Sequence, residues 1–471
     1  MVYKGFKMIS KVNCAILLLF LVSLPSTLYS APQYSTLITQ ADRKNFLKYE
    51  VNDVYVETVK HVIKISNFYF TNVVGGKLFV PIIRNETSSH YAILYNVSSS
   101  NGAPFTIEKD DSGNIYACWD NIDIRGQGTF QVELDYHVFS FSLHYTVNSS
   151  LITDYNSASD LYRKYTQPED LIESDNPEIV SEAESLTCNV SDFHEKVLKI
   201  YEFVKNHIHY VIQPEERGAL WALKSKTGDC SEYSYLFVAL CRAAGIPARV
   251  QAGFAFHGFS ETLKDGHMWA EYYLGNYGWV PVDATWGLFD ATDGHHFSSI
   301  QSVPEIIPYA NYVFNYTSGP EEEYVKDEQL VSTKPCSVSI FNDSFVESVV
   351  KTVSKLRQAK FTILIGKIFG AFALFPSEAK EVKRTLLESE VQLQNAIESW
   401  EESPKIAQSE AINAFEKAEK VVHDAWLLIV KTLTVFISIP VIILLVASIL
   451  LKRQHQTQQQ KEKVVTEVSF T

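Results

Sequence analysis

One block of the sequence places a thiol, an imidazole and a carboxylate on successive predicted elements. Cys230 follows Gly228-Asp229, His267 opens the run His-Met-Trp-Ala-Glu, and Asp283 ends the run Trp-Val-Pro-Val-Asp. The thiolate is the reactive form of cysteine, so a nucleophilic thiol needs a base beside it and a third group that orients the base. The block contains all three, and a fold that uses them has to bring distant parts of the chain together.

The helix that carries the thiol can be predicted from its apolar pattern. Residues 231–244 read as a helix that Cys230 opens and that Gly245-Ile246-Pro247 ends. Asp229 suits the N-cap position of this helix. The positive end of a helix and its free N–H groups favour a thiolate and can hold a developing oxyanion, so we expect Cys230 to be activated there.

Short strands are predicted after this helix, and they carry the other two groups. A turn at Asn276-Tyr277-Gly278 joins the second strand to the third and makes them a hairpin. Such a hairpin places Asp283 beside His267 on adjacent strands, with the helix packed across them. The predicted strands cover residues 249–255, 267–274 and 279–283.

Four segments in this order and spacing resemble the transglutaminase-like superfamily, a papain-type branch of thiol enzymes. They are Ala219-Leu220-Trp221-Ala222-Leu223 leading to Gly228-Asp229-Cys230, Leu240-Cys241-Arg242-Ala243-Ala244-Gly245-Ile246-Pro247-Ala248-Arg249, His267-Met268-Trp269-Ala270-Glu271, and Trp279-Val280-Pro281-Val282-Asp283-Ala284-Thr285-Trp286-Gly287. The resemblance covers residues 193–299. It implies that Cys230 is the nucleophile, His267 the general base and acid, and Asp283 the orienting group. It maps no side-chain oxyanion donor onto this chain.

Three aromatic residues are further candidates for the site. Trp221 and Tyr210 are candidates for the second half of an oxyanion hole, and Trp286 follows Asp283 closely enough to line a cleft. A tryptophan in a folded domain is more often part of the core than of a substrate site. The structural interpretation of these residues therefore stays open beside the functional one.

Other polar residues near the block have structural explanations. Cys241 is expected to pack in the core, as most free cysteines do. His295 and His296 lie in a loop beyond the predicted triad, where packing or a place at the cleft rim is favoured over catalysis. Glu232 and Glu271 can tune the charge of the site or pair with a cation. No metal site and no cofactor is predicted, because His207 and His209 have no further ligands at a suitable spacing.

Both ends of the chain carry targeting features. Lysines at 4, 7 and 11 precede an apolar run at 14–24, which is typical of a secretory signal peptide, with an uncleaved signal anchor as the alternative. Residues 427–451 are nearly continuously apolar and long enough to cross a bilayer. Lys452 and Arg453 follow directly, so the positive-inside rule predicts a single-pass cell-membrane protein with its main part outside and a short C-terminal tail in the cytoplasm.

Potential glycosylation sites agree with this topology. All N-x-S/T sequons precede the apolar span, and the asparagines concerned are Asn85, Asn96, Asn148, Asn189, Asn315 and Asn342. On the same side Cys118, Cys188 and Cys336 are placed where a disulfide can persist, and the sequence leaves open which of them pair.

Length and net charge limit which partners and how many domains can be expected. The chain has 471 residues and a formal net charge of -14. No basic stripe is present to neutralise phosphates, so nucleic acid is not expected as a partner. The expected segments are a signal peptide (1–31), a β-rich, sandwich-like domain (32–150), an acidic connector (151–192), a transglutaminase-like core (193–300), an extension (301–343), a helical hairpin or stalk (344–426), a transmembrane helix (427–451) and a cytoplasmic tail (452–471).

One apolar segment of the stalk fits none of these elements well. Residues 361–375 are too short for a comfortable membrane span and contain Lys367. We expect a buried helix or one that lies on the membrane. A second crossing is the alternative, but it would reverse the orientation that Lys452 and Arg453 indicate.

The sequence thus predicts an α+β fold: a papain or transglutaminase-like core with an N-terminal β-rich domain, a helical stalk and one transmembrane helix. The resemblance implies a thiol acyl-transfer enzyme that acts on protein or peptide amides through an acyl-thioester. Hydrolysis by a cysteine peptidase or amidase is favoured, since no calcium loop of the D-x-D-x-D type is found. The alternatives are a protein-crosslinking transglutaminase and a non-catalytic surface protein that uses the fold as a scaffold.

Overall fold

The structure is a computed structural model that describes residues 46–84, 87, 89–301, 304–341, 343–400 and 402–468, with side chains up to residue 454. The predicted signal peptide, Asn85 and Asn342 lie outside these residues. Helices and strands both contribute, and the strands pair antiparallel in every sheet except the short pair β7 (His209–Tyr210) and β8 (Thr227–Gly228). The α+β class is confirmed.

Helix α6 (Cys230–Ala243) lies at the centre of the core, as predicted. It ends before Gly245, whose φ of 75° is a left-handed conformation that glycine adopts without strain. Every residue from Ser231 to Arg242 is buried, so this helix has no solvent-facing side. Its neighbours are α2 (Asp160–Thr166), α3 (Pro177–Thr187), α4 (Phe193–His207) and α5 (Ala219–Ser225).

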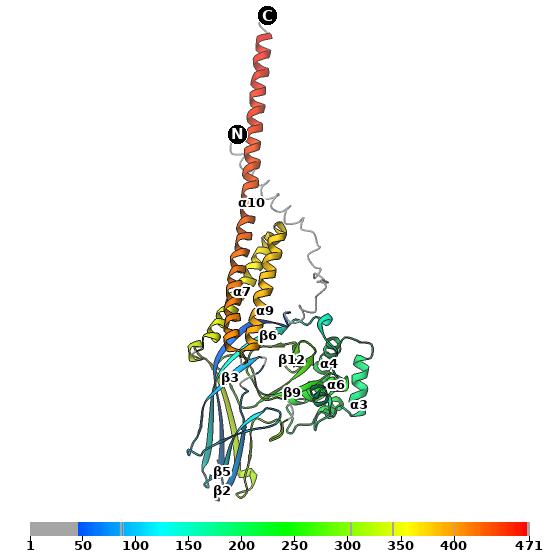
Figure 1. Cartoon of the computed structure of the whole chain (residues 1–471), viewed down its shortest axis with the longest axis vertical. Helices are drawn as coiled ribbons and strands as arrows, with labels where there is room; N and C mark the ends of the chain where they lie inside the picture. Colours follow the sequence, from blue (N-terminus) through cyan, green and yellow to red (C-terminus); the bar gives the residue numbers. More distant parts are fainter. Residues whose placement is uncertain are drawn as a thin grey trace. The chain divides into compact units, whose positions relative to one another are not determined.

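A five-stranded antiparallel sheet packs against α6 in the order β13-β12-β11-β9-β15 (Figure 1). Ala270 lies opposite Val282, which is the hairpin expected between the second and third predicted strands. On the other side of the second strand, His267 lies opposite Gly253 of the first. The predicted arrangement of a cysteine-bearing helix on an antiparallel sheet is therefore confirmed. The strands are β9 (Ala248–Ala255), β11 (His267–Leu274), β12 (Gly278–Asp283), β13 (Leu288–Phe289) and β15 (His296–Gln301).

Two further sheets share a second apolar core that includes Ile63, Trp119 and Leu134. One has the order β10-β17-β1-β6-β14 with β3 paired to β6, and the other the order β16-β2-β5-β4. Their strands are β1 (Tyr49–Asn67), β2 (Val73–Pro81), β3 (His90–Ser99), β4 (Thr106–Lys109), β5 (Ile115–Ile124), β6 (Thr129–Tyr145), β10 (Thr262–Leu263), β14 (Ala291–Thr292), β16 (Val313–Asn315) and β17 (Val325–Pro335).

These sheets extend beyond the boundary expected at residue 150. β17 pairs with β1 along eleven residues of register, from Glu57 opposite Pro335 to Asn67 opposite Val325. β14, which follows Asp283 in the chain, pairs with β6. Local alternation of apolar and polar residues reveals a strand but not its partner, so the sequence could not assign these later strands to the first sheet.

The segment 151–192, expected to be an acidic connector, contains packed helices. α3 buries Ile179 and Ala183 and lies against α6. Its acidic residues occupy the outward positions of an amphipathic helix, with Asn176 as N-cap and Pro177 in the first turn. The acidic residues that suggested a connector therefore belong to the outward-facing side of α3, a helix that packs in the core.

The stalk consists of more than a hairpin. α7 (Ser344–Ile368), α9 (Pro376–Ser399) and α10 (Pro404–Val468) pack side by side, and the short α8 (Ala371–Leu374) joins the first two (Figure 1). α10 continues through Pro440, and its part from Pro404 to Gln454 contains a stretch long and apolar enough to cross a membrane. The described residues also contain short 3-10 turns at Ser149–Leu151, Glu322–Tyr324 and Val338–Phe341.

The outer-side cysteines and sequons are placed as follows. Cys118, Cys188 and Cys336 are all free thiols, as are Cys230 and Cys241, so no disulfide links the cysteines that the structure describes. The asparagines of the described sequons are exposed, which leaves them accessible to modification, and they are Asn96, Asn148, Asn189 and Asn315.

Candidate active site

Cys230 is the first residue of α6, held there by a capping box. Asp229 accepts a hydrogen bond from the Ser231 N–H at 3.1 Å, and Glu232 accepts one from the Asp229 N–H at 3.0 Å. Cys230 itself is partly exposed. An N–H in the first turn of a helix has no acceptor within that helix, so the N–H of Cys230 is available beside its own sulfur.

His267 is the first residue of β11 and connects the thiol to the carboxylate. Its Nε2 donates to Oδ2 of Asp283 at 2.6 Å. Cys230 is the second neighbour of the imidazole, because interactions with its side chain contribute to the raised pKa of His267. The imidazole of His267 thus bonds the carboxylate of Asp283 and interacts with Cys230.

Asp283 is the last residue of β12, and both of its oxygens have partners. Oδ1 accepts the N–H groups of Thr285 at 2.8 Å and Trp286 at 2.9 Å, so the turn after the strand fixes the carboxylate. Oδ2 is then turned toward His267. A carboxylate held in this way selects one tautomer of the imidazole and stabilises its protonated form.

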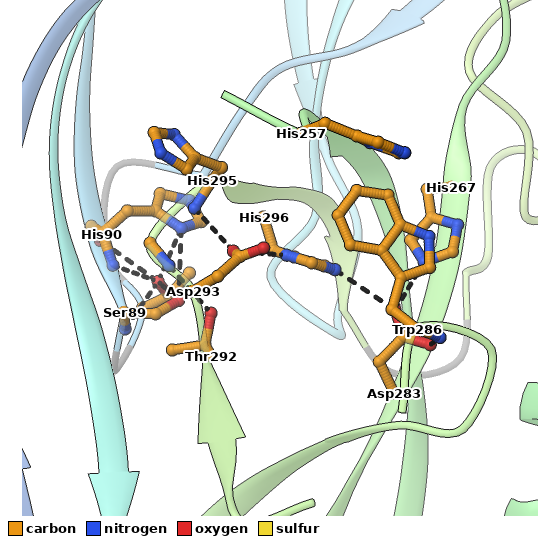
Figure 2. A network of polar contacts seen from close by, with 12 residues as sticks. Ser89, His90, His257, His267, Asp283, Trp286, Thr292, Asp293, His295 and His296 are labelled. Atoms are coloured by element: carbon orange, nitrogen blue, oxygen red, sulfur yellow. Dashed lines mark hydrogen bonds and ion pairs between the residues drawn. The ribbon is translucent and has the colours of Figure 1, made fainter. Parts of the chain in front are cut away.

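A second imidazole, which the sequence analysis assigned to packing or the cleft rim, contacts the same carboxylate (Figure 2). His296 Nε2 lies 3.2 Å from Oδ2 of Asp283, and its Nδ1 lies 2.8 Å from Oδ1 of Asp293. Its side chain is only 3% exposed, so it is a buried member of the polar network. The spacing of Asp293 and His296 by three residues was the available signal, but the sequence could not show that β15 returns to Asp283.

His295, its neighbour, points elsewhere and matches the packing interpretation. Its Nδ1 lies 3.4 Å from the buried carboxylate of Glu57, and its ring packs at a tilt against that of Tyr55, with the centroids 4.4 Å apart. Glu232 belongs to the capping box, and Glu271 forms an ion pair with Arg249 at 2.6 Å. Both glutamates therefore have structural partners.

The charges of this network are strongly coupled. Burial by itself would lower the pKa of His267, but hydrogen bonds to Asp283 and Cys230 and the charges of both raise it to about 9. Burial likewise opposes charge on His296, and its bonds to Asp283 and Asp293 raise the pKa of that imidazole to about 9. The two imidazoles together hold the pKa of Asp283 well below its usual range, despite its burial. Near neutral pH the network favours an ionised carboxylate between two imidazolium groups.

The same three residues lie close enough to be considered as metal ligands. One ligand atom each of His267, Asp283 and His296 lies within 4.8 Å of the others. Both imidazoles already point at one carboxylate oxygen with hydrogen-bond geometry. A metal ion would have to separate His267 from Asp283, so we interpret the cluster as a hydrogen-bonded network.

Aromatic side chains surround the imidazole. The ring centroid of Trp286 lies 5.2 Å from that of His267 and 4.9 Å from that of His296, and His257 packs on the edge of Trp286 at 4.4 Å. Trp269 stacks along His267 at 6.0 Å. Trp286 is therefore at the candidate site, as expected, and it covers the imidazole pair.

The two candidate oxyanion residues differ in position. Tyr210, in β7, is half exposed and pairs with Gly228, two residues before Cys230 in the chain. Burial is the main cause that raises the pKa of its phenol. Trp221 lies on α5, which packs on α6, and is partly buried.

A cavity of about 390 Å³ lies apart from this site, and its lining includes Tyr49, Tyr145, Arg249, Trp279 and Trp400 but no residue of the candidate triad.

Comparison with known proteins gives matches to the same part of the chain. Residues 181–284 match the family model described as the transglutaminase-like superfamily. A protein-glutamine gamma-glutamyltransferase of Pseudomonas aeruginosa is 32% identical over 16% of this chain and 13% of its own length. An uncharacterized protein of Haemophilus influenzae is 38% identical over 12% of this chain and 21% of its own length. The match thus spans a minor part of each of these two proteins.

Among solved structures, a Cytophaga hutchinsonii protein described as a candidate cysteine protease is similar over 61% of this chain and 93% of that chain, with 16% identity and a TM-score of 0.48. The family model, in contrast, spans the segment that holds Cys230, His267 and Asp283. This segment of the chain is a domain of the transglutaminase-like superfamily.

Proposed function

We propose that this protein is a membrane-anchored thiol enzyme that cleaves protein or peptide amides through an acyl-thioester. The observation that carries the proposal is the position of His267, whose imidazole donates to the Asp283 carboxylate and has its pKa raised by its interactions with Asp283 and Cys230. Cys230 is partly exposed while Asp283 is buried, so a substrate can reach the sulfur but not the orienting group. A scaffold without catalysis has no need for this combination.

The first half of the reaction forms the thioester. His267, whose pKa is raised to about 9 despite its burial, takes the thiol proton of Cys230 as the general base and becomes an imidazolium. The sulfur of Cys230 attacks the amide carbonyl and a C–S bond forms. As the C–N bond breaks, His267 gives its proton to the leaving amine.

The second half returns the enzyme to its starting state. Neutral His267 takes a proton from a water molecule, whose oxygen attacks the thioester carbonyl. The C–S bond breaks, the carboxylic acid leaves, and the thiolate again faces the imidazolium. Asp283 keeps the same ring nitrogen protonated throughout, because its Oδ2 accepts from Nε2.

The oxyanion of each tetrahedral intermediate needs hydrogen-bond donors. The N–H of Cys230, at the positive end of α6, is the backbone donor in this proposal. The phenol of Tyr210 is the side-chain donor we favour over Trp221, because Tyr210 pairs with Gly228, two residues before Cys230. Burial keeps this phenol in its donating, protonated form at neutral pH.

Membrane anchoring and topology form the second part of the proposal. The apolar stretch of α10 crosses the membrane once, and Lys452 and Arg453 hold its C-terminal end on the cytoplasmic side. The candidate site and the exposed sequons then face outward. Protease treatment of intact cells that express the chain with epitope tags before and after α10 tests this topology; digestion of the C-terminal tag alone would contradict it.

Crosslinking is the second candidate, since one similar protein is named a gamma-glutamyltransferase. In that case a lysine amine, rather than water, attacks the thioester and an isopeptide bond forms. Incubation of the full-length protein with a peptide library, with and without a labelled amine, distinguishes the two. Free carboxyl products indicate hydrolysis, and incorporation of the amine indicates transfer.

A labelling experiment tests catalysis itself against the scaffold alternative. At pH 5.5, an iodoacetamide probe is expected to label Cys230 about ten to a hundred times faster than Cys188, an exposed free thiol of the same chain. His267→Ala is expected to abolish the difference and leave Cys188 unchanged. Equal labelling rates in the unmodified protein would support a scaffold.

A further inference from the structure

The turn between α7 and α9 carries a group of large apolar side chains that face solvent. We call Phe361, Leu364, Ile368, Phe369 and Leu374 the apolar tip; all are exposed, and Ile368 is 69% exposed. They are close together along the chain and border the α8 segment. An exposed apolar group of this kind marks a surface that something apolar covers.

The last turns of α7 are apolar on two sides. Ala359, Ile363 and Gly366 face the bundle and are buried, which accounts for one side. Phe361, Leu364 and Ile368 follow a spacing of three and four residues, so they form a second stripe that the bundle does not cover. Packing among the residues that the structure describes therefore explains only the first stripe.

The apolar tip lies level with the start of the apolar part of α10. A Cβ on Gly366 would lie 3.5 Å from Ile429, so α7 and α10 touch there. Lys431 Nζ lies 3.7 Å from Glu378 and 5.8 Å from the ring centroid of Phe375. Three separate contacts thus place residues 366–378 beside residues 429–431.

The length of the apolar stretch locates the membrane boundary at the same level. Lys431 is the last charged residue before Lys452. The residues between them rise about 30 Å at about 1.5 Å per residue, which equals the hydrocarbon thickness of about 30 Å. Lys431 therefore lies where the headgroups begin, and Trp426, which is exposed one turn before it, suits the interfacial aromatic belt.

We propose that the apolar tip is embedded in the lipid interface of the leaflet that α10 enters. This rests on the proposed membrane anchoring. Ile368, Phe369 and Leu374 insert below the headgroups, and Phe361 and Leu364 lie at the outer edge. Lys367, exposed on the same turn, extends its ammonium toward the headgroups.

This contact changes what the stalk does. A single transmembrane helix can pivot about its point of entry, whereas a second contact at the apolar tip fixes the bundle at two points. The three-helix bundle then holds a defined tilt on the bilayer. In this proposal residues 361–375 neither cross the membrane a second time nor form a buried helix. They contact the lipid interface beside the transmembrane part of α10.

Site-specific fluorescence measures this contact in the full-length protein. One cysteine is introduced at a time in a background where Cys188, Cys230 and Cys336 are replaced by serine, since these free thiols are at least partly exposed. Each variant is labelled with an environment-sensitive dye and placed in phosphatidylcholine nanodiscs at one copy per disc. Ile368→Cys reports on the apolar tip and Ile442→Cys on the span. Leu387→Cys, on the exposed face of α9 away from the turn, is the matched control.

The expected result is a blue shift of the emission at positions 368 and 442, with loss of intensity when the lipids carry a spin label, and neither change at 387. Quenching at 442 without quenching at 368 would overturn the apolar-tip proposal and leave anchoring intact. No quenching at 442 would overturn the anchoring itself. A blue shift at 368 that spin-labelled lipid does not quench, and that grows with several copies per disc, would assign the apolar tip to a second copy of the chain instead.

Discussion

His296 and His267 approach the same oxygen of Asp283, at 3.2 Å and 2.6 Å. One carboxylate therefore orients the candidate base and balances a second buried imidazole. Because Asp293 contacts the far side of His296, the network has two carboxylates and two imidazoles in alternation. The charge of His296 acts on Asp283, and the charge of Asp283 acts on His267. A substitution of His296 is therefore expected to change the reactivity of the candidate nucleophile, Cys230.

Replacement of Asp283 tests the orienting role. Asp283→Asn keeps the size of the side chain but removes the charge that stabilises the imidazolium, so kcat/KM for amide cleavage is expected to fall by about 10³ to 10⁴. Asp293→Asn, which contacts His296 and not His267, is the control and should lose far less. Similar losses in both variants would mean that the fold, and not the orientation of His267, was damaged.

His296 is expected to act as a positioning residue through its charge. In His296→Gln a neutral donor can still reach Asp283, while His296→Leu leaves the buried carboxylate one partner short and should lower the free energy of unfolding by about 1–3 kcal/mol. Both variants remove a positive charge beside Asp283, so the full carboxylate charge acts on His267 and raises its pKa further. The basic limb of the pH–kcat/KM profile should therefore move to higher pH in both variants.

The unfolding free energy and the pH profile together distinguish a charge-based role of His296 from a role in packing alone. If His296 only fills space, His296→Gln restores both the unfolding free energy and the pH profile. Under our interpretation His296→Gln has nearly the unfolding free energy of the unmodified protein, but the basic limb of its pH–kcat/KM profile stays at higher pH. An unshifted limb in both variants would contradict a charge-based role.

Stability of the core is expected to decrease at alkaline pH. His267 and His296 have a pKa of about 9 in the folded chain and about 6.5 when unfolded, so between these values the folded state binds more protons. Stabilisation by both groups is complete below about pH 6.5 and is lost as pH rises through 9. Thermal unfolding of the full-length protein in nanodiscs from pH 6 to 10 measures this slope. The double variant His267→Gln and His296→Gln should show a clearly flatter slope over the same range.

The capping box of α6 links stability to thiol reactivity. Asp229→Ala removes the acceptor of the Ser231 N–H and should destabilise the protein by about 1–2 kcal/mol, whereas Asp229→Asn, also a good N-cap, should cost much less. The labelling rate of Cys230 should fall with Asp229→Ala, because the start of the helix is no longer held. Asn176→Ala removes the N-cap of α3 and is the control: similar destabilisation, unchanged labelling.

The secondary structure around the site could be predicted from sequence to within a residue or two. Periodicity, the N-cap at Asp229 and the stop at Gly245 depend on contacts between neighbouring residues, and α6, β9, β11 and β12 follow from them. The turn at Asn276-Tyr277-Gly278 depends on such contacts too. Where residues a few positions apart decide the conformation, their order in the chain is sufficient information.

Features that depend on pairing across long stretches of chain were not predictable. The partner of β1 is β17, and the partner of Asp283 includes His296 at the start of a strand on the opposite edge of the sheet. A strand pattern specifies which side chains face inward, but the choice of its neighbour is made by the packing of the whole core. For the same reason the acidic segment 151–192 was mistaken for a connector.

By itself, then, the sequence determined which groups could act: a thiol at a helix start, an imidazole and a carboxylate on a hairpin, and an apolar stretch long enough to cross a bilayer. The tertiary structure decided which charges share one buried site, and that the exposed residues of the apolar tip lie level with the start of that stretch. The physical reason is the distance along the chain over which each kind of interaction acts. Local propensity acts over a few residues, whereas the burial of charge and of apolar surface depends on every segment that packs nearby.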